Sequence, residues 1–268
     1  MPSRRLEQNL SPCERAERPK APDRMPPSVI LSQAELDDAL HLLRFRDRAL
    51  VDALLAVAGP PPLRARRADF AGLVWIVASQ QLSRASANAV YGRLIALLPD
   101  LDSRSFRAAD DEELRACGLS APKLRCLKEL AAEVEDRGLD FDSFSTMKPE
   151  PVRERLLSIV GIGPWTAEIF LLFCLGLPDA WPSGDLALQE AVRIALRLHA
   201  RPKQCEMDKL GERWRPWRGV AARLLWAYYG VIEKPPSLKH GKRRKERRSE
   251  RMDRSGAARA AGVSKGKA

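Results

Sequence analysis

The sequence contains few cysteines and no closely spaced cysteine pair. Five cysteines are scattered over 268 residues, and no two of them form a CxxC motif. An odd number of scattered cysteines argues against a disulfide framework, and the missing CxxC spacing argues against a zinc or iron–sulfur site. We therefore expect free thiols, no iron–sulfur cluster and no required cofactor.

Long apolar runs are also missing. The longest one extends from Ile169 to Leu177 and contains Gly176, which makes it about half as long as the roughly 20 residues of a membrane-spanning helix. The N-terminus has no apolar core of the kind that secretory signal peptides contain. These two absences predict a soluble, cytoplasmic protein without a membrane partner.

The central part of the chain lacks an excess of either charge. The formal net charge is +11, but residues 239–268 alone contain 12 Lys and Arg against 3 Asp and Glu, and residues 1–29 contain 6 against 4. Residues 30–238 hold 28 of each sign. A basic chain favours a polyanionic partner such as nucleic acid, yet here the positive charge lies at the ends of the sequence.

Composition divides the chain into three parts. Residues 1–29 are rich in Pro, Arg and Glu and have few apolar residues, so we expect a disordered leader. Residues 30–236 carry the apolar periodicity of a folded domain. Residues 237–268 contain the run GKRRKERRSER, which predicts a basic tail that is disordered unless an acidic partner binds it.

The apolar periodicity of the domain is helical. Ser32 and Glu35 form a capping box before an apolar pattern at Leu36, Leu40, Leu43 and Leu50, and residues 70–98 repeat apolar side chains at three- and four-residue steps. No two alternating apolar runs are joined by a hairpin turn. The sequence therefore predicts an all-α fold, with further helices over residues 111–116, 121–136, 149–159, 164–175, 186–198, 207–213 and 218–229.

The segment LLSIVGIGPWTA, residues 156–167, predicts two helices joined by a glycine turn. Gly161 and Gly163 allow a tight turn, and Pro164 suits the first turn of the second helix. Backbone N–H groups around Gly161, Gly163 and Thr166 can then form a seat for one phosphate, because a helix N-terminus carries partial positive charge. The alternative is a plain connection between two helices.

The segment WPSGDLAL, residues 181–188, places Asp185 between a loop and the start of a helix. The helix dipole favours a negative charge at this position. Taken alone, Asp185 is better explained as an ordinary N-cap. The pairing of the two segments favours a further role for its carboxylate.

The ordered pair GIGPWTA and PSGD resembles the helix-hairpin-helix superfamily of DNA base-excision glycosylases. Two more segments are similar to its alkylated-base branch, that of DNA-3-methyladenine glycosylase II: VASQQLS at residues 77–83 and RWRPWRGVAARLLWAYYG at residues 213–230. The resemblance extends from about residue 35 to 232. It implies a two-lobed helical fold with an active cleft between the lobes, and a monomer that binds damaged double-stranded DNA near the nucleoid.

The resemblance also implies roles for individual residues. Asp185 falls on the catalytic aspartate, which would stabilise an oxocarbenium-like sugar and orient or deprotonate a water molecule. Trp165 stands where bifunctional members have a lysine that forms a Schiff base. An indole cannot attack the sugar, so a monofunctional enzyme is expected.

The remaining implied residues bind the base, the duplex and a cation. Leu82 would be the wedge that fills the gap left by a flipped base, with Gln81 beside it. Any one of the aromatic residues can equally be a core residue, since aromatics at helical spacing usually bury. The implied base pocket consists of Trp226, Trp165, Tyr228 and Trp75, and the carbonyls of Leu157, Ile159 and Ile162 would hold a structural monovalent cation.

Three functions remain open at this point. The first is a glycosylase that releases alkylated purines such as 3-methyladenine and 7-methylguanine. The second is the same scaffold with another lesion specificity: hypoxanthine, uracil or an oxidised purine. The third is a DNA-binding protein without enzymatic activity, in which Asp185 is only a helix cap.

Overall fold

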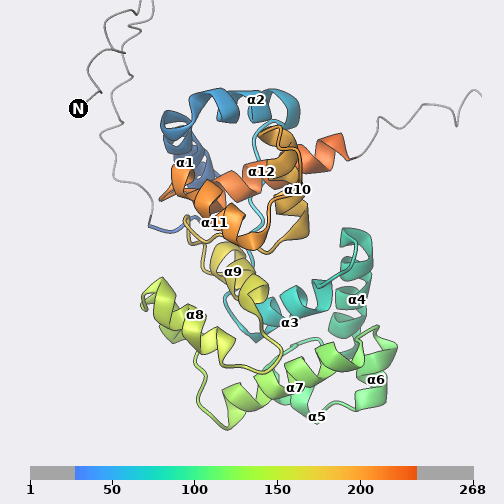
Figure 1. Cartoon of the computed structure of the whole chain (residues 1–268). Helices are drawn as coiled ribbons and strands as arrows, with labels where there is room; N and C mark the ends of the chain where they lie inside the picture. Colours follow the sequence, from blue (N-terminus) through green and yellow to red (C-terminus); the bar gives the residue numbers. More distant parts are fainter. Residues whose placement is uncertain (1–27, 234–268) are drawn as a thin grey trace, which may run out of the picture. The chain divides into compact units, whose positions relative to one another are not determined.

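The computed structural model describes residues 28–233, which contain helices and no strand (Figure 1). The chain divides into a unit that ends at Tyr228 and a second unit that begins at Tyr229. In chain order the elements are α1 (Gln33–Arg46), α2 (Arg48–Ala58), α3 (Phe70–Ser79), α4 (Arg84–Leu97), α5 (Ser103–Ala108), α6 (Asp111–Ala116), α7 (Ala121–Glu135), η1 (Asp142–Ser145), α8 (Pro149–Leu157), α9 (Pro164–Phe173), α10 (Leu186–Ala195), α11 (Gln204–Gly211), η2 (Glu212–Trp214) and α12 (Arg218–Ile232).

The all-α prediction is confirmed, and several helices begin where their capping residues indicate. Ser32 accepts a hydrogen bond from the Glu35 backbone N–H, and the Glu35 side chain accepts one from the Ser32 N–H, which completes the predicted capping box. α6 has the predicted bounds, and α7 ends one residue early. None of the helices between residues 28 and 233 is long and apolar enough to cross a membrane.

Two apolar patterns that are continuous in the sequence are each divided between two helices in the structure. α1 ends at Arg46, and Leu50 belongs to α2. Asp47 lies between the two helices, and its carboxylate accepts a hydrogen bond from Trp214 Nε1 at 3.0 Å and pairs with Arg213 at 2.9 Å. The residue at the break is therefore in contact with residues far along the chain.

The pattern over residues 70–98 likewise belongs to two helices. Asp69 caps α3 through the Gly72 N–H, and Ser83 caps α4 through the Ser86 N–H. Between the helices, the C-cap Gln80 leaves the helical conformation with a ψ of 130°, and Gln81 follows with a left-handed φ of +57°. Residues 80–82 therefore form a turn between α3 and α4.

The hydrophobic core extends from α3 to α9 and the segment that follows it. Leu73, Leu127 and Phe170 are fully buried within this core, one each from α3, α7 and α9. α9 contacts both α3 and α8, and Figure 1 shows α8 and α9 as neighbours. The N-terminus of α9 is therefore held by the core on one side and by the hairpin on the other.

The predicted domain boundaries stay predictions. The basic tail, residues 237–268, lies outside the described residues, as does the leader apart from Ser28 and Val29. The division of the helical domain into two lobes with a cleft is also untested.

Candidate active site

Asp185 is the N-cap of α10. Its Oδ1 accepts a hydrogen bond from the Leu188 backbone N–H at 2.7 Å, so the capping role is real. The turn before it is closed by a hydrogen bond from the Asp185 N–H to the Pro182 carbonyl at 2.9 Å. Local bonds thus fix the backbone on both sides of the carboxylate.

Two indole N–H groups also bind the Asp185 carboxylate. Trp165 Nε1 of α9 donates to Oδ2 at 2.8 Å, and Trp226 Nε1 of α12 donates to Oδ1 at 3.0 Å. Hydrogen bonds to a charged acceptor are among the stronger ones in proteins. Both oxygens of the half-buried Asp185 are therefore oriented, which a capping role alone does not require.

Trp226 belongs to a stacked set of side chains. Its ring stacks on that of Phe173, with centroids 5.8 Å apart and planes inclined by 25°. The Arg223 guanidinium lies 4.6 Å from the centroid of Phe173 and donates to the Leu172 carbonyl at 2.8 Å. Burial, together with the nearby charge of Arg64, lowers the pKa of Arg223 to about 10. This stacking holds the Trp226 ring in the orientation in which its Nε1 donates to Asp185.

The other predicted pocket residues have different surroundings. The Arg66 guanidinium lies over the ring of Trp75, 3.9 Å from its centroid, so a cation covers one face of that ring. Tyr228 is half-buried and follows Trp226 by two residues on α12. Residues i and i+2 of a helix do not face each other. The base-pocket roles of these side chains remain predictions.

The predicted glycine turn joins α8 to α9. Gly161 has a φ of +90°, whereas Gly163 has a φ of −96° and is the N-cap of α9. Pro164 begins the helix, as predicted. The N–H groups of Gly163, Trp165 and Thr166 donate to no acceptor within residues 28–233. These free donors at a helix N-terminus are suited to an anion.

The predicted wedge segment is held from two sides. Lys123 of α7 donates from Nζ to the carbonyls of Ala78 at 2.8 Å and Gln80 at 2.7 Å, and burial lowers the pKa of Lys123. Gln80 Nε2 donates to the Thr166 hydroxyl at 2.9 Å. Leu82 is left 39% exposed. The Thr166 hydroxyl oxygen therefore accepts a hydrogen bond from Gln80, and both its O–H and its backbone N–H can still donate.

The predicted cation ligands lie in the same turn. The Ile159 carbonyl accepts a hydrogen bond from the Ile162 N–H at 3.0 Å, which leaves its second lone pair for another donor or a cation. Neutral backbone oxygens of this kind are compatible with a hard monovalent ion. Leu157 is the last residue of α8. The described residues contain no group of three or more His, Cys, Asp or Glu that could hold a metal ion.

The order of hairpin, loop and capping aspartate agrees with a known family model. Residues 74–216, just over half of the chain, match the model described as HhH-GPD superfamily base excision DNA repair protein. The chain belongs to this superfamily. Among curated relatives of this HhH-GPD protein, DNA-3-methyladenine glycosylase 1 of Schizosaccharomyces pombe is 34% identical over 166 residues, 60% of this chain and 72% of the relative.

Solved structures of HhH-GPD relatives share the fold. A Schizosaccharomyces pombe 3-methyladenine DNA glycosylase in complex with abasic DNA has a TM-score of 0.67 and 30% identity, over 74% of this chain and 99% of that one. A DNA-3-methyladenine glycosidase from Bacillus halodurans has a TM-score of 0.61 and 30% identity, over 73% and 90% of the two chains.

Several contacts around the site were not predicted from the sequence. The hydrogen bonds of Trp165 and Trp226 to Asp185, and the contacts of Lys123 and Glu168, join residues that are distant in the sequence. The importance of Glu168 could have been recognised from the sequence, because Glu168 is the only charged residue of the largely apolar α9. A charge within a buried helix indicates a partner.

Proposed function

We propose that the protein is a monofunctional DNA glycosylase that hydrolyses the N-glycosidic bond of alkylated purines during base excision repair. The observation that carries this proposal is the Asp185 carboxylate, which is fixed through both oxygens by indoles from two helices. A simple cap needs only the bond to Leu188. Relatives named as 3-methyladenine glycosylases support the substrate class.

The chemistry of alkylated purines suits a single carboxylate. 3-Methyladenine and 7-methylguanine carry positive charge on the ring in DNA, so the base departs as a neutral molecule with the electron pair of the C–N bond. Positive charge then develops on the sugar, where Asp185 stabilises it. Water adds to the sugar carbon, and Asp185 accepts the proton that the water loses.

Trp165 supports the absence of strand cleavage. A lyase step requires an amine that attacks the sugar carbon and forms a Schiff base. The indole of Trp165 has no such nucleophile, and its N–H is bound to Asp185. The expected product is an intact strand with an abasic site.

The substrate is double-stranded DNA with a damaged base, bound by a monomer. A base inside a duplex must be extruded before Asp185 can act on its sugar. The exposed Leu82 is suited to fill the vacated stack, and the free N–H groups at the start of α9 are suited to one phosphate. Such contacts need no excess of positive charge in the domain.

The test is release of free base from methylated DNA in single turnover. Wild-type protein should release 3-methyladenine and leave sites that break only on alkaline treatment. Asp185→Asn should lower the rate by roughly 100-fold or more, the range found for removal of one electrostatic stabiliser. Asp110→Asn is the matched control, because Asp110 caps α6 in the same way.

Three outcomes would contradict the proposal. If Asp185→Asn released free base at the wild-type rate, the mechanism assigned to Asp185 would be refuted. Equal affinity for intact and lesion-containing duplexes, with no base released from any of a panel of defined lesions, would favour a DNA-binding protein without activity. Release of hypoxanthine, uracil or an oxidised purine alone would assign the scaffold another specificity.

A further inference from the structure

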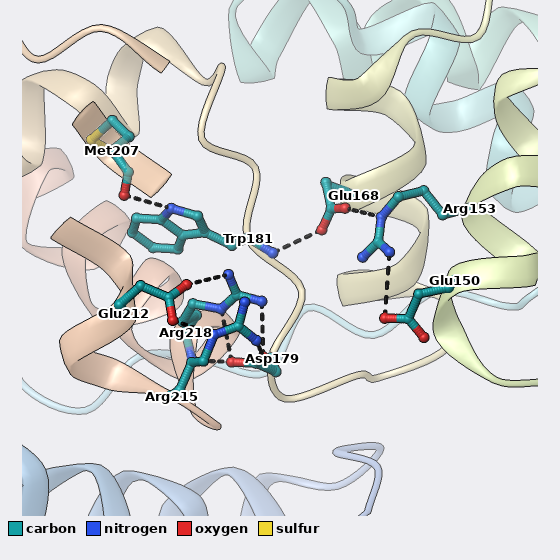
Figure 2. Close-up of polar contacts among 9 residues, drawn as sticks. All are labelled: Glu150, Arg153, Glu168, Asp179, Trp181, Met207, Glu212, Arg215 and Arg218. Atoms are coloured by element: carbon teal, nitrogen blue, oxygen red, sulfur yellow. Dashed lines mark hydrogen bonds and ion pairs between the residues drawn. The ribbon is translucent and has the colours of Figure 1, made fainter. Parts of the chain in front are cut away.

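The segment from Asp179 to Asp185 is attached to α12 at both of its ends. Asp179 accepts hydrogen bonds from Arg218, the first residue of α12, through Nε at 2.9 Å and Nη2 at 2.8 Å, and from Arg215 at 2.7 Å. At the other end, Trp226 of the same helix donates to Asp185. Figure 2 shows the two arginines converging on Asp179.

The same segment is attached to α9 at two points. Trp165 donates to Asp185, and one turn later Glu168 accepts the Trp181 backbone N–H through Oε2 at 2.8 Å. The other oxygen of Glu168 accepts Nε of Arg153 from α8 at 2.6 Å. Figure 2 shows the Glu168 carboxylate between Trp181 and Arg153. Its side chain is only 13% exposed.

The three residues between these two α9 contacts are folded into a compact turn. The Ser183 N–H donates to the Trp181 carbonyl at 2.8 Å, and the Asp185 N–H donates to the Pro182 carbonyl at 2.9 Å. The buried Gln189 donates from Nε2 to the Ser183 carbonyl at 2.9 Å. These hydrogen bonds fold the segment on itself between Trp181 and Asp185.

We propose that Glu168 is a positioning residue for Asp185: by holding the Trp181 N–H, it sets the distance of the carboxylate from the sugar. This inference rests on the proposed glycosylase function. Displacements of about 1 Å at a reacting group can cost up to about 100-fold in rate. Glu168 therefore acts on the chemical step without touching the substrate.

Glu168→Gln is a sharp perturbation because the amide has only one acceptor oxygen. The charged Arg153 donor attracts that oxygen, since hydrogen bonds to charged groups are the stronger ones. The NH₂ group then faces the Trp181 N–H, and two donors oppose each other. We expect a 10- to 100-fold lower single-turnover rate, with the affinity for a duplex containing a tetrahydrofuran abasic analogue changed less than about threefold.

The double variant Arg153→Met with Glu168→Gln should rescue the rate. Without Arg153, the amide oxygen is free to accept the Trp181 N–H, so the attachment of the segment is restored although the ion pair is lost. We expect the double variant to recover most of the wild-type rate. If the ion pair of Arg153 and Glu168 were purely structural, the double variant should not be faster than Glu168→Gln, because it has lost both partners.

Glu133→Gln is the matched control. Glu133 is also buried and also binds an arginine of α8, Arg155, at 2.8 Å, but it lies on α7 and does not contact the 179–185 segment. We expect a comparable loss of thermal stability and an unchanged single-turnover rate. A rate loss equal to that of Glu168→Gln would overturn the proposal.

Indole N–H resonances report the position of Asp185 without substrate. In Glu168→Gln, the indole N–H signals of Trp165 and Trp226 should shift. In the double variant they should return. Unshifted signals, or a double variant slower than the single one, would refute the positioning role. Wild type that releases no base while these shifts occur would instead refute the proposed function.

Discussion

The two glycines of the hairpin should respond differently to alanine. At Gly161 the φ of +90° imposes a strain of about 1–3 kcal/mol on any other residue. An added Cβ would lie 2.7 Å from Cβ and 2.9 Å from Sγ of Cys126, and overpacking of this kind costs about 1–3 kcal/mol. Gly161→Ala should therefore lower the free energy of unfolding by about 2–5 kcal/mol.

Gly163→Ala is the internal comparison. Its φ of −96° suits any residue, and no atom lies within 4 Å of the added Cβ. Alanine is a poorer N-cap than glycine, but it also reduces the entropy of the unfolded chain, and both effects are below about 1 kcal/mol and opposite in sign. Stability should stay nearly constant. If the open space serves a DNA phosphate, the methyl group should instead weaken DNA binding.

Thermal unfolding and DNA affinity separate the two effects. For a domain of this size, 3 kcal/mol corresponds to a fall in Tm of about 6–12 °C. We expect this fall for Gly161→Ala only, and a severalfold higher Kd for a duplex with an abasic analogue for Gly163→Ala. Equal Tm losses for both variants would refute the packing argument, and an unchanged Kd for Gly163→Ala would refute the phosphate seat.

Two further predictions concern the thiols and the tail. Burial raises the pKa of Cys126 to about 11 from its ordinary value of 9.0, so the unfolded chain ionises first; the free energy of unfolding should fall between pH 9 and 11, by at most about 1.4 kcal/mol per pH unit from this thiol. In Cys126→Ala, the free energy of unfolding measured with urea should depend less on pH over this range. An unchanged pH dependence would contradict the prediction. Deletion of residues 239–268 should reduce the salt dependence of duplex binding and spare single-turnover release; loss of release would place the tail within the catalytic fold.

Local sequence patterns predicted the helices because their causes are local. Capping by Ser32 and Asp185 involves residues three positions away, and the apolar periodicity of α7 depends only on the sequence within the helix. α5 was missed because its six residues are too few for a periodic pattern and, unlike α6, it has no acidic residues in its first turn. The break at Asp47 was missed because the residues that contact the Asp47 carboxylate, Trp214 and Arg213, lie far along the chain.

The sequence by itself determined the order of the motifs, the helical class and the placement of Asp185 at a helix start. Tertiary structure decided how that carboxylate is held. Trp165 and Trp226 are 20 and 41 residues from Asp185, and Glu168 acts on it through Trp181. Which side chains meet across such separations is set by the packing of α9 and α12, because hydrogen bonds between distant residues form only after the core has fixed the helices that carry them.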